Sequence, residues 1–208
     1  MLNFFKLIFG DSVLKINSFV IKVILVLKGI KVGKNFYISG VPKLKIKSKL
    51  PNITIGDNVK ILGNIDLRTR ENGKIFFKND TLIEEDCRFV SARDGVIEIG
   101  QGTKVCADCI INGGEDIIIG KNCIIGKNTS INSNSHSMLK KETILNQGFD
   151  LKPVIIGDDC WTGINSVITY GVTLKKGTVI GANSLINKDT EEYSINVGLP
   201  AKKIRNRE

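Results

Sequence analysis

An aliphatic or small residue recurs at every sixth position between Ile119 and Glu191, with one interruption, and it is usually followed by glycine. An α-helix repeats near 3.6 residues and a simple strand near 2, so a period of six fits neither element alone. This period is typical of a solenoid in which each short strand lies on one flat face and a turn leads to the next face. Three such faces close one triangular coil of about 18 residues, with the first residue of each six pointing inward. The sequence therefore predicts an all-β solenoid.

The fifth position of each six tests this interpretation, because a tight corner admits only small side chains. The residues at these positions are all small and uncharged, as the pattern requires. They are Cys87, Thr103, Cys123, Thr129, Ser135, Cys160, Ser166, Val172, Thr178, Ser184 and Thr190. The repeat is interrupted most strongly between Ser137 and Pro153. There we expect a protruding loop of about 17 residues that serves as a lid or a substrate loop.

Three segments resemble the hexapeptide-repeat acyltransferases: residues 157–168 (GDDCWTGINSVI), 180–189 (IGANSLINKD) and 198–205 (GLPAKKIR). The resemblance extends over about residues 53–205. It implies a left-handed parallel β-helix, whereas the usual crossover rule favours right-handed connections. Within that family the chain is most similar to the O-acetyltransferases that modify sugars of capsules and other surface polysaccharides with acetyl-CoA.

We expect three regions in the chain: a helical and irregular N-terminal segment at 1–50, the β-helix at 51–190 with its loop at 137–153, and a polar, basic tail at 191–208. Lysines interrupt the apolar run of the N-terminal segment, which is shorter than a membrane span, and no small-residue cleavage site follows it. Two interpretations stay open for this segment. An amphipathic helix caps the open end of the solenoid, which we favour, or its basic and apolar surface contacts the inner face of the membrane.

The net charge of +9 indicates an anionic partner. No nucleic-acid recognition motif is visible, so CoA phosphates, an acidic sugar chain or an anionic membrane surface are better candidates. The five cysteines include one CxxC pair, Cys106 and Cys109, without the second pair or the histidines of a zinc site. Most cysteines fall at the small corner positions, where a thiol packs as a small apolar group. We therefore expect no metal, and reduced cysteines in a cytoplasmic protein.

His136 is the only histidine, and it stands among small polar residues at the root of the interrupted region. In the resembled family a histidine heads such a loop and acts as the general base, so the resemblance assigns this role to His136. Imidazole, with a pKa of about 6.5, can accept the proton of a sugar hydroxyl near neutral pH. We expect direct attack on the thioester without an acyl-enzyme, and an oxyanion bound by a backbone N–H of residues 161–163. Glu142 and Asp150 are the candidate acidic partners of the histidine.

The resemblance places Trp161 beside the catalytic histidine and the acyl carrier, and packing against a neighbouring subunit is the alternative for this ring. It also implies that Gly163 and Ala182 are small because the pantetheine arm of the cofactor passes over them. Cationic side chains near the C-terminus match positions that hold the CoA phosphates, although a solvated tail would explain them equally. The further cofactor contacts that the resemblance implies are Asn187, Lys188, Lys202 and Arg205.

In family members that bind small free sugars, an asparagine upstream of the histidine holds the acceptor, whereas the matching position here is Cys106. We therefore expect a different acceptor pocket, with Asn112 and Asn134 as substrate contacts and a polymer or lipid-linked acceptor. N-acetylation of an amino sugar is the alternative reaction. The resemblance also implies a homotrimer, because a neighbouring subunit completes the face that carries the histidine.

Overall fold

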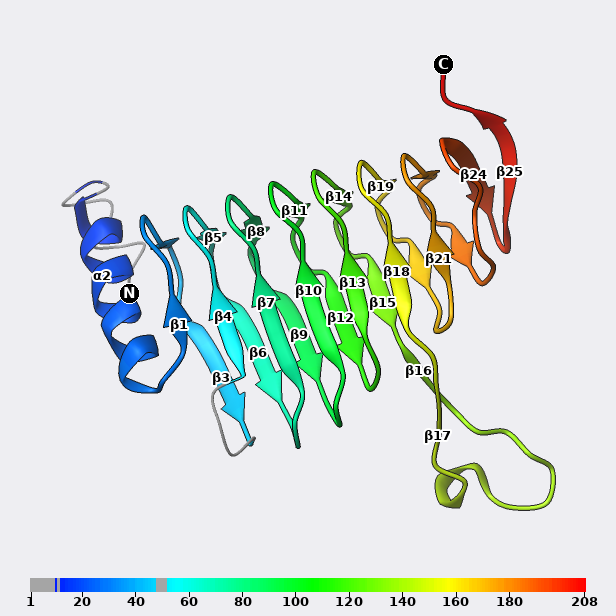
Figure 1. The fold of residues 1–208 in the computed structure, drawn as a ribbon, viewed down its shortest axis with the longest axis horizontal. Helices are drawn as coiled ribbons and strands as arrows, with labels where there is room; N and C mark the ends of the chain where they lie inside the picture. Colours follow the sequence, from blue (N-terminus) through cyan, green and yellow to red (C-terminus); the bar gives the residue numbers. More distant parts are fainter. Residues whose placement is uncertain (1–9, 11, 48–51) are drawn as a thin grey trace.

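The computed structural model of the 208-residue chain describes residues 10, 12–47 and 52–208. Its body is a parallel β-solenoid whose coils follow one another along the long axis of the molecule (Figure 1). Successive strands fall in turn into three parallel sheets, which we term A, B and C. The predicted all-β solenoid class is therefore confirmed, and its handedness stays an expectation from the resemblance.

Up to β23, each sheet collects every third strand of the solenoid in the order of the sequence, and β24 and β25 then extend one of the sheets. Sheet A contains β1 (Lys31–Val32), β4 (Ile53–Ile55), β7 (Lys74–Phe77), β10 (Val96–Ile99), β13 (Ile117–Ile119), β18 (Val154–Ile156) and β21 (Thr173–Leu174). Sheet B contains β2 (Tyr37–Ile38), β5 (Lys60–Leu62), β8 (Leu82–Glu84), β11 (Lys104–Val105), β14 (Ile124–Ile125), β19 (Trp161–Thr162), β22 (Val179–Ile180), β24 (Ser194–Gly198) and β25 (Ala201–Asn206). Sheet C contains β3 (Pro42–Ile46), β6 (Ile65–Thr69), β9 (Cys87–Ser91), β12 (Ile110–Gly113), β15 (Ser130–Asn132), β20 (Val167–Ile168) and β23 (Leu185–Ile186).

The inward positions of the coils form one continuous apolar core in which isoleucine is the most frequent residue. Ile97, Ile117 and Val154 illustrate the arrangement, because they are registered partners in β10, β13 and β18 and are fully buried. β-branched side chains suit such short strands, where each packs on its equivalent in the next coil. Burial of each one contributes about 1.5–3 kcal/mol, so the stack of aliphatic residues stabilises the solenoid along its length.

The corners have a second regular feature, a left-handed backbone conformation immediately before the small corner residue. Asn and Asp occupy most of these positions because their short polar side chains tolerate positive φ angles. Examples with φ between 55° and 61° are Asn58, Asp108, Asn122, Asn128, Asp159, Asn165 and Asn183. The small corner residues that the repeat predicts are buried, with the exception of Ser135. Each hexapeptide thus specifies both the side chain that points inward and the turn that follows the strand.

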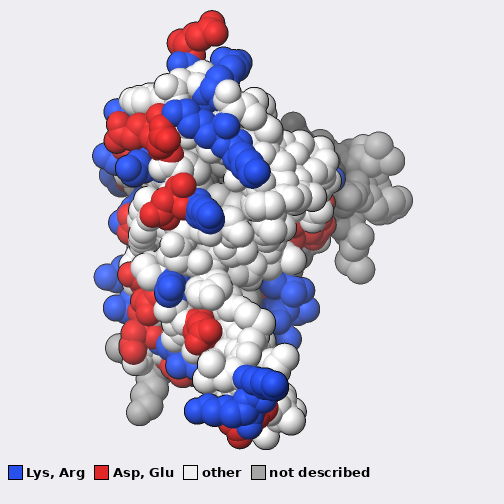
Figure 2. Space-filling view, turned by 90° about the vertical axis from the view of Figure 1, so that its right-hand side faces the viewer, with Lys and Arg blue, Asp and Glu red and all other residues white. Residues whose placement is uncertain are grey.

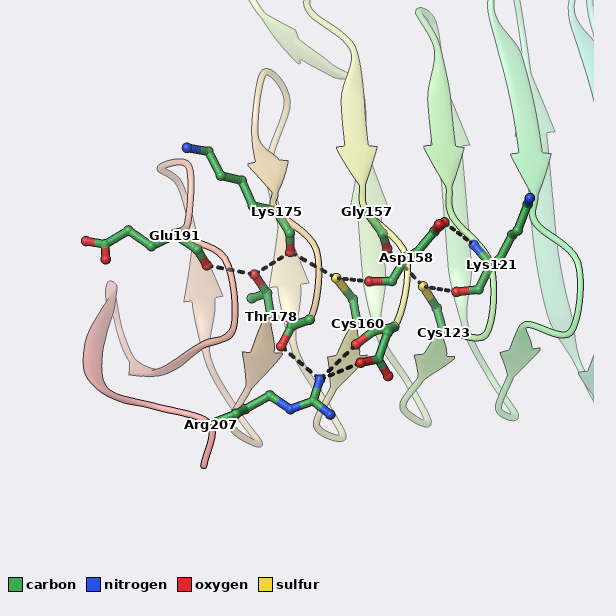
Figure 3. Close-up of polar contacts among 11 residues, drawn as sticks. Lys121, Cys123, Gly157, Asp158, Cys160, Lys175, Thr178, Glu191 and Arg207 are labelled. Carbon is green, nitrogen blue, oxygen red and sulfur yellow. Dashed lines mark hydrogen bonds and ion pairs between the residues drawn. The ribbon is translucent and has the colours of Figure 1, made fainter.

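Cysteine thiols at one corner connect successive coils (Figure 3). Cys123 Sγ donates to the carbonyl of Gly157 at 3.1 Å, and Cys160 Sγ donates to the carbonyl of Lys175 at 3.2 Å. One coil further, the Thr178 hydroxyl donates to the next carbonyl in the same way, at 3.2 Å. The contact with Cys123 and burial raise the pKa of Cys160, so this thiol stays protonated. The four cysteines predicted at corners are buried there, whereas Cys106 is half-buried, and all five are free.

The solenoid begins earlier than predicted. β1, β2 and β3 pair with β4, β5 and β6, so residues 31–46 form the first coil rather than an irregular segment. The high lysine content of β3 concealed an alternation in which Leu44 and Ile46 are half-buried while Lys43 and Lys45 are exposed. The predicted boundary at 50/51 itself lies outside the described residues.

Helix α2 (Ser12–Leu27) lies across the N-terminal end of the solenoid (Figure 1). Leu14, Ile21 and Leu25 are buried against the first coil, and the Ser18 hydroxyl contacts the Ile38 carbonyl at 3.0 Å. The helix therefore caps the open end, as we favoured. Residues 1–9 of the predicted N-terminal segment lie outside the described ranges. Within those ranges, no helix has the length and apolarity needed to cross a membrane.

The C-terminal residues form a hairpin instead of the predicted free tail. β24 extends sheet B in parallel with β22, and β25 returns antiparallel to β24. Arg207 then fixes the end of the chain, because its Nη1 donates to Asp159 Oδ2 at 2.8 Å and to the Gly177 carbonyl at 3.1 Å (Figure 3). Viewed from this end, cationic and acidic side chains lie next to each other (Figure 2). The C-terminal region is therefore part of the folded solenoid.

Candidate functional site

A two-stranded arm projects from the corner where sheet C turns to sheet A (Figure 1). We define the arm as residues 134–151, which include β16 (Asn134–His136), the 3-10 helix η1 (Ile144–Asn146) and β17 (Phe149–Leu151). β16 and β17 pair antiparallel, with His136 opposite Phe149. The predicted loop at 137–153 is thus a hairpin arm, and His136 lies within its first strand rather than before it.

The His136 side chain is exposed on this arm and lies against an aromatic ring. The centroids of His136 and Phe149 are 4.4 Å apart, with 39° between the ring planes. Among the described residues, none donates a hydrogen bond to the imidazole or accepts one from it. The two predicted acidic partners, Glu142 and Asp150, form no ion pair with it in this chain. The ring nitrogens therefore remain accessible to an acceptor.

A hollow of about 160 Å³ lies at the base of the arm. Small residues create it, since Ala92, Gly113 and Gly114 occupy neighbouring coils there. Both predicted substrate residues line it, Asn112 from β12 and Asn134 from β16. Its complete lining is Arg70, Glu71, Val90, Ala92, Arg93, Asn112, Gly113, Gly114, Asn134, Phe149 and Leu151. The hollow offers amide groups, cations and an aromatic wall, which together suit a polar ligand.

Only Asn112 and Asn134 of this lining were predicted from the sequence, and three of the missed residues offer a ring or a charge to a ligand. Phe149 belongs to the hollow and also contacts His136, so it links the ligand site to the imidazole. The Arg93 guanidinium carbon lies 5.8 Å from the centroid of Phe149, and Arg70 enters from the neighbouring coil. The signal that could have found the two arginines is a basic residue at the same corner two and three coils before the arm. Larger grooves exist elsewhere, for example one of 360 Å³ over sheet A, but they contain none of the predicted site residues.

The Trp161 side chain is 51% exposed on the outer face of sheet B. Its registered partners form a row across the sheet, from Trp161 through Val179 and Ile195 to Arg205. With strands about 4.8 Å apart, this row extends about 14 Å from the indole to the strand that carries Arg205. An apolar strip that ends in a cation is thus present at the position of the predicted cofactor contacts.

Gly163 and Ala182 are adjacent at the corner between sheets B and C, but Gly163 has a reason of its own to lack a side chain. A Cβ atom on Gly163 would lie 2.4 Å from the Ala182 backbone nitrogen. Close packing of the next coil therefore requires glycine there whether or not a cofactor passes over it, and the predicted cofactor contact stays a prediction. Ala182 is exposed, so its small side chain leaves the outer surface open.

The other predicted cofactor residues fall in two places. Lys202 lies on β25 close to Arg205, at the end of the Trp161 row, and both are exposed. Asn187 and Lys188 follow β23 at the corner between sheets C and A, away from sheet B. Within one chain the structure groups Trp161, Gly163, Ala182, Lys202 and Arg205, and it separates Asn187 and Lys188 from them.

The predicted oxyanion donors are engaged in the fold. The backbone N–H of Trp161 donates to the Thr178 carbonyl at 2.9 Å, and that of Gly163 donates to the Ile180 carbonyl at 2.7 Å. These bonds hold consecutive coils together. Neither of these two N–H groups is therefore free to bind an oxyanion in this chain, and the oxyanion donor within residues 161–163 stays a prediction.

His136 and Trp161 are far apart in one chain. β16 belongs to the arm below the corner of sheets C and A, whereas β19 lies in sheet B on the opposite side of the solenoid (Figure 1). The expectation that the indole lies beside the histidine is not met within a single chain. The two residues can meet only if a second copy brings its sheet B to the arm.

The CxxC thiols do not form a second reactive centre, because Cys109 is fully buried and its thiol donates to the Gly126 carbonyl at 3.1 Å, while Cys106 is held as a thiol. Burial raises the pKa of Cys106, and the carboxylate of Glu84 raises it further. A thiol held in its protonated form is a poor nucleophile. Among the described residues, no group of three or more His, Cys, Asp or Glu side chains could hold a metal ion.

Comparisons with known proteins identify the repeat in the sequence as well as in the coils. Residues 153–188 match the bacterial transferase hexapeptide (six repeats), and residues 116–133 match the hexapeptide repeat of succinyl-transferase. A probable acetyltransferase of Mycobacterium tuberculosis is 29% identical over 75% of this chain and 50% of its own length. The chain spans half or less of the length of the curated relatives that it matches.

Two solved structures share the solenoid. A hexapeptide-repeat acetyltransferase of Vibrio cholerae, solved with acetyl-CoA, is 34% identical, with a TM-score of 0.51 over 53% of this chain and 60% of that chain. The polySia-specific acetyltransferase NeuO is 21% identical, with a TM-score of 0.52 over 85% of this chain and 86% of that chain. At that identity, the second likeness concerns the fold alone.

Proposed function

Since this chain is a member of the hexapeptide-repeat family, we propose that it is an acetyl-CoA-dependent O-acetyltransferase that modifies a hydroxyl of a surface-polysaccharide sugar. The observation that carries the proposal is the accessible His136 on the arm. Phe149, which contacts His136, also lines a polar hollow. A base next to an acceptor site is what hydroxyl acylation needs, because a sugar hydroxyl is a poor nucleophile at neutral pH. The similarity to an acetyltransferase solved with acetyl-CoA supports the donor.

The proposed reaction is a direct transfer. The acceptor hydroxyl gives its proton to His136 while its oxygen attacks the thioester carbonyl, which forms a tetrahedral intermediate. The intermediate collapses with cleavage of the C–S bond, and the leaving thiolate recovers the proton from the imidazolium. The products are an O-acetyl ester and CoA with a free thiol. The protonated state of Cys106 argues against a covalent detour through that residue.

The outer row of sheet B is the proposed donor surface. The pantetheine arm lies along Trp161, Val179 and Ile195, and the CoA phosphates contact Lys202 and Arg205. Cations at the end of an apolar strip match a cofactor whose thiol arm ends in phosphates. Ala182 leaves the corner beside this row open. Asn187 and Lys188 would contact the donor only from a different subunit, because they lie at another corner.

The proposal requires an oligomer, and a homotrimer is the proposed state. The arm of one chain delivers His136 to sheet B of the next, which gives three equivalent sites in a closed ring. Acidic partners for the imidazole, such as Glu142 or Asp150, would also be provided at this interface. The use of acetyl-CoA as the donor and the free cysteines favour action in the cytoplasm. The exposed apolar side of α2 favours contact with the inner face of the membrane.

Acetyl transfer with labelled acetyl-CoA tests the proposal. Purified wild type should release CoA thiol and label a glycan acceptor from acidic and neutral capsule fragments, and mild alkali should remove the label because it is an ester. His136→Ala should fail to label, whereas Lys140→Ala, an exposed change on the same arm, should label normally. Label that resists alkali would indicate the alternative, N-acetylation of an amino sugar. Absence of thiol release with all acceptors would contradict the proposed activity.

A further inference from the structure

Sheet C carries a strongly basic outer face at its N-terminal end, which the proposed reaction does not explain. We define the basic face as the outward positions of β3, β6 and β9 with the residue that follows each strand. Among these described positions there are six cations and one carboxylate. The nine positions are Lys43, Lys45, Lys47, Asp66, Arg68, Arg70, Arg88, Val90 and Ala92. Part of the chain's net charge of +9 is therefore concentrated on this face.

The single carboxylate neutralises only part of this face. Asp66 accepts hydrogen bonds from Arg68 at 2.9 and 2.5 Å, and Arg88 Nε lies 3.4 Å from the same carboxylate. In the part of the chain that the structure describes, no carboxylate pairs with the side chains of Lys45, Lys47 or Arg70. Like charges on neighbouring strands repel one another, and they are tolerated here only because they face solvent. An anionic ligand would relieve this repulsion.

The basic face is grooved, and the groove leads to the arm. Lys45, Lys47, Arg68 and Arg70 line a groove of about 400 Å³. Arg70 also lines the hollow at the base of the arm, so the two depressions share one side chain. Phe149, which also lines the hollow, contacts the ring of His136. With strands about 4.8 Å apart, the path from β3 to β15 extends about 19 Å, long enough for several sugar units.

The character of the face changes along this path. Beyond the cations, the outward positions of β12 and β15 are mainly polar and uncharged, with Asn112, Ser130 and Asn132. Asn112 Nδ2 lies 3.4 Å from Asn132 Oδ1, so the amides form a row next to the hollow. Amides and hydroxyls bind sugar hydroxyl groups, while arginine and lysine bind carboxylates or phosphates.

We infer that the acceptor is an acidic glycan chain, held by its anionic groups along Lys45, Lys47 and Arg70 while a hydroxyl of a following unit reaches His136. This inference rests on the proposed function and names the substrate class of that same site. Single-stranded nucleic acid fits less well, because no aromatic side chain for base stacking occurs among the described positions of the basic face. A membrane surface fits less well too, since the large exposed apolar face lies on α2 instead.

Binding to defined polymers tests the inference without catalysis. Polygalacturonate, a polyuronate, and dextran, a neutral glucan, are titrated against the wild type at low and high salt in the absence of acetyl-CoA. Polygalacturonate should bind, and the binding should weaken with salt, while dextran should not bind measurably. Lys45→Gln combined with Arg70→Gln should weaken binding at least about tenfold, because charged hydrogen bonds are lost. Arg70→Lys should retain part of the affinity because it keeps the charge.

The matched control removes the same charge from another corner. Lys175→Gln with Lys176→Gln, both exposed between sheets A and B, should bind polygalacturonate as the wild type does. Equal binding of dextran, unchanged binding by the Lys45/Arg70 variant, or tighter binding of duplex DNA or phosphatidylglycerol vesicles through these residues would each overturn the inference. If the wild type binds polygalacturonate but transfers no acetyl group to any acceptor, the proposed function is wrong and the assignment of the basic face as a glycan-binding surface stands.

Discussion

At the scale of single residues, His136 is the side chain on which the proposed chemistry depends. His136→Ala should lower kcat by roughly 10² to 10⁴, the usual contribution of a positioned general base. The dissociation constant of CoA should change little, because the proposed donor surface is on sheet B and not on the arm. Thiol release and calorimetry measure both quantities, and a variant with wild-type kcat would remove the base assignment.

Trp161 should respond differently from His136. Its indole is half exposed at the start of the apolar row, so Trp161→Ala should weaken CoA binding as well as turnover. Loss of a stacked aromatic contact is worth about 0.5–1.5 kcal/mol beyond lost area, which corresponds to a severalfold or larger rise in the dissociation constant. Ile124→Ala, in the row on its other side, is the matched control because it lies further from Arg205. Calorimetry with CoA should show the weaker binding for Trp161→Ala alone.

The corner cysteines should be structural. Cys160→Ala should leave turnover intact and lower the free energy of unfolding by about 1 kcal/mol or more, from lost packing and a lost bond to the Lys175 carbonyl. Cys106→Ser should also keep full activity, and chelators should have no effect. Chemical denaturation and thiol-release assays measure these outcomes. Loss of activity in folded Cys106→Ser would point to an acyl-cysteine route.

At the scale of elements, the sequence was most informative where one repeat unit determines one element. The buried first positions and small corners of the later coils followed from the pattern of six, because each side chain packs on its equivalent in the next coil. The first coil was missed because lysines at the outward positions of β3 obscured its aliphatic alternation. The β24–β25 hairpin was missed because its residues are polar on the outside and its last contacts, such as that of Arg207 with Asp159, join distant positions.

Part of the candidate site followed from the sequence, but its assembly did not. Asn112 and Asn134 line the same hollow because β12 and the arm strand β16 meet at one corner, and His136 is two residues further along β16. Phe149 and Arg93 were missed because the pairing of the arm strands sets their positions, and no local repeat reports it. Trp161 was expected beside the histidine, and the sequence alone did not show that a single chain places them on opposite sides.

Helix α2 has two faces with separate roles. Its buried face caps the solenoid, while Phe19 and Leu27 are 69% and 81% exposed on the other face. Phe19→Ser with Leu27→Ser should lower binding to phosphatidylglycerol vesicles at least about tenfold, because each side chain loses apolar burial in the lipid. Thermal unfolding should change little, and Val41→Ser, an exposed apolar change outside the helix, should bind as the wild type does. Cosedimentation checks this, and a wild type that stays in solution would contradict the membrane contact.

At the scale of the whole molecule, the separation of His136 from Trp161 makes the assembly part of the active site. A homotrimer of three times 22.9 kDa is the expected species in solution. A fully active monomer, shown by light scattering at assay concentration, would mean that the two residues need not meet. The basic face and the arm would then act without a donor surface from a neighbour.

Subunit complementation shows whether the active site lies between two subunits. His136→Ala lacks the base, and Ala182→Trp blocks the donor surface with a bulky side chain at an exposed position. Each variant alone should be inactive, but trimers reassembled from an equal mixture should regain about a quarter of the wild-type activity, because one site in four combines an intact arm with an intact sheet B. Mass spectrometry of the mixed trimers confirms that subunits have exchanged. If exchanged trimers are no more active than the separate variants, the site does not lie between subunits and His136 does not act on a donor held by a neighbour.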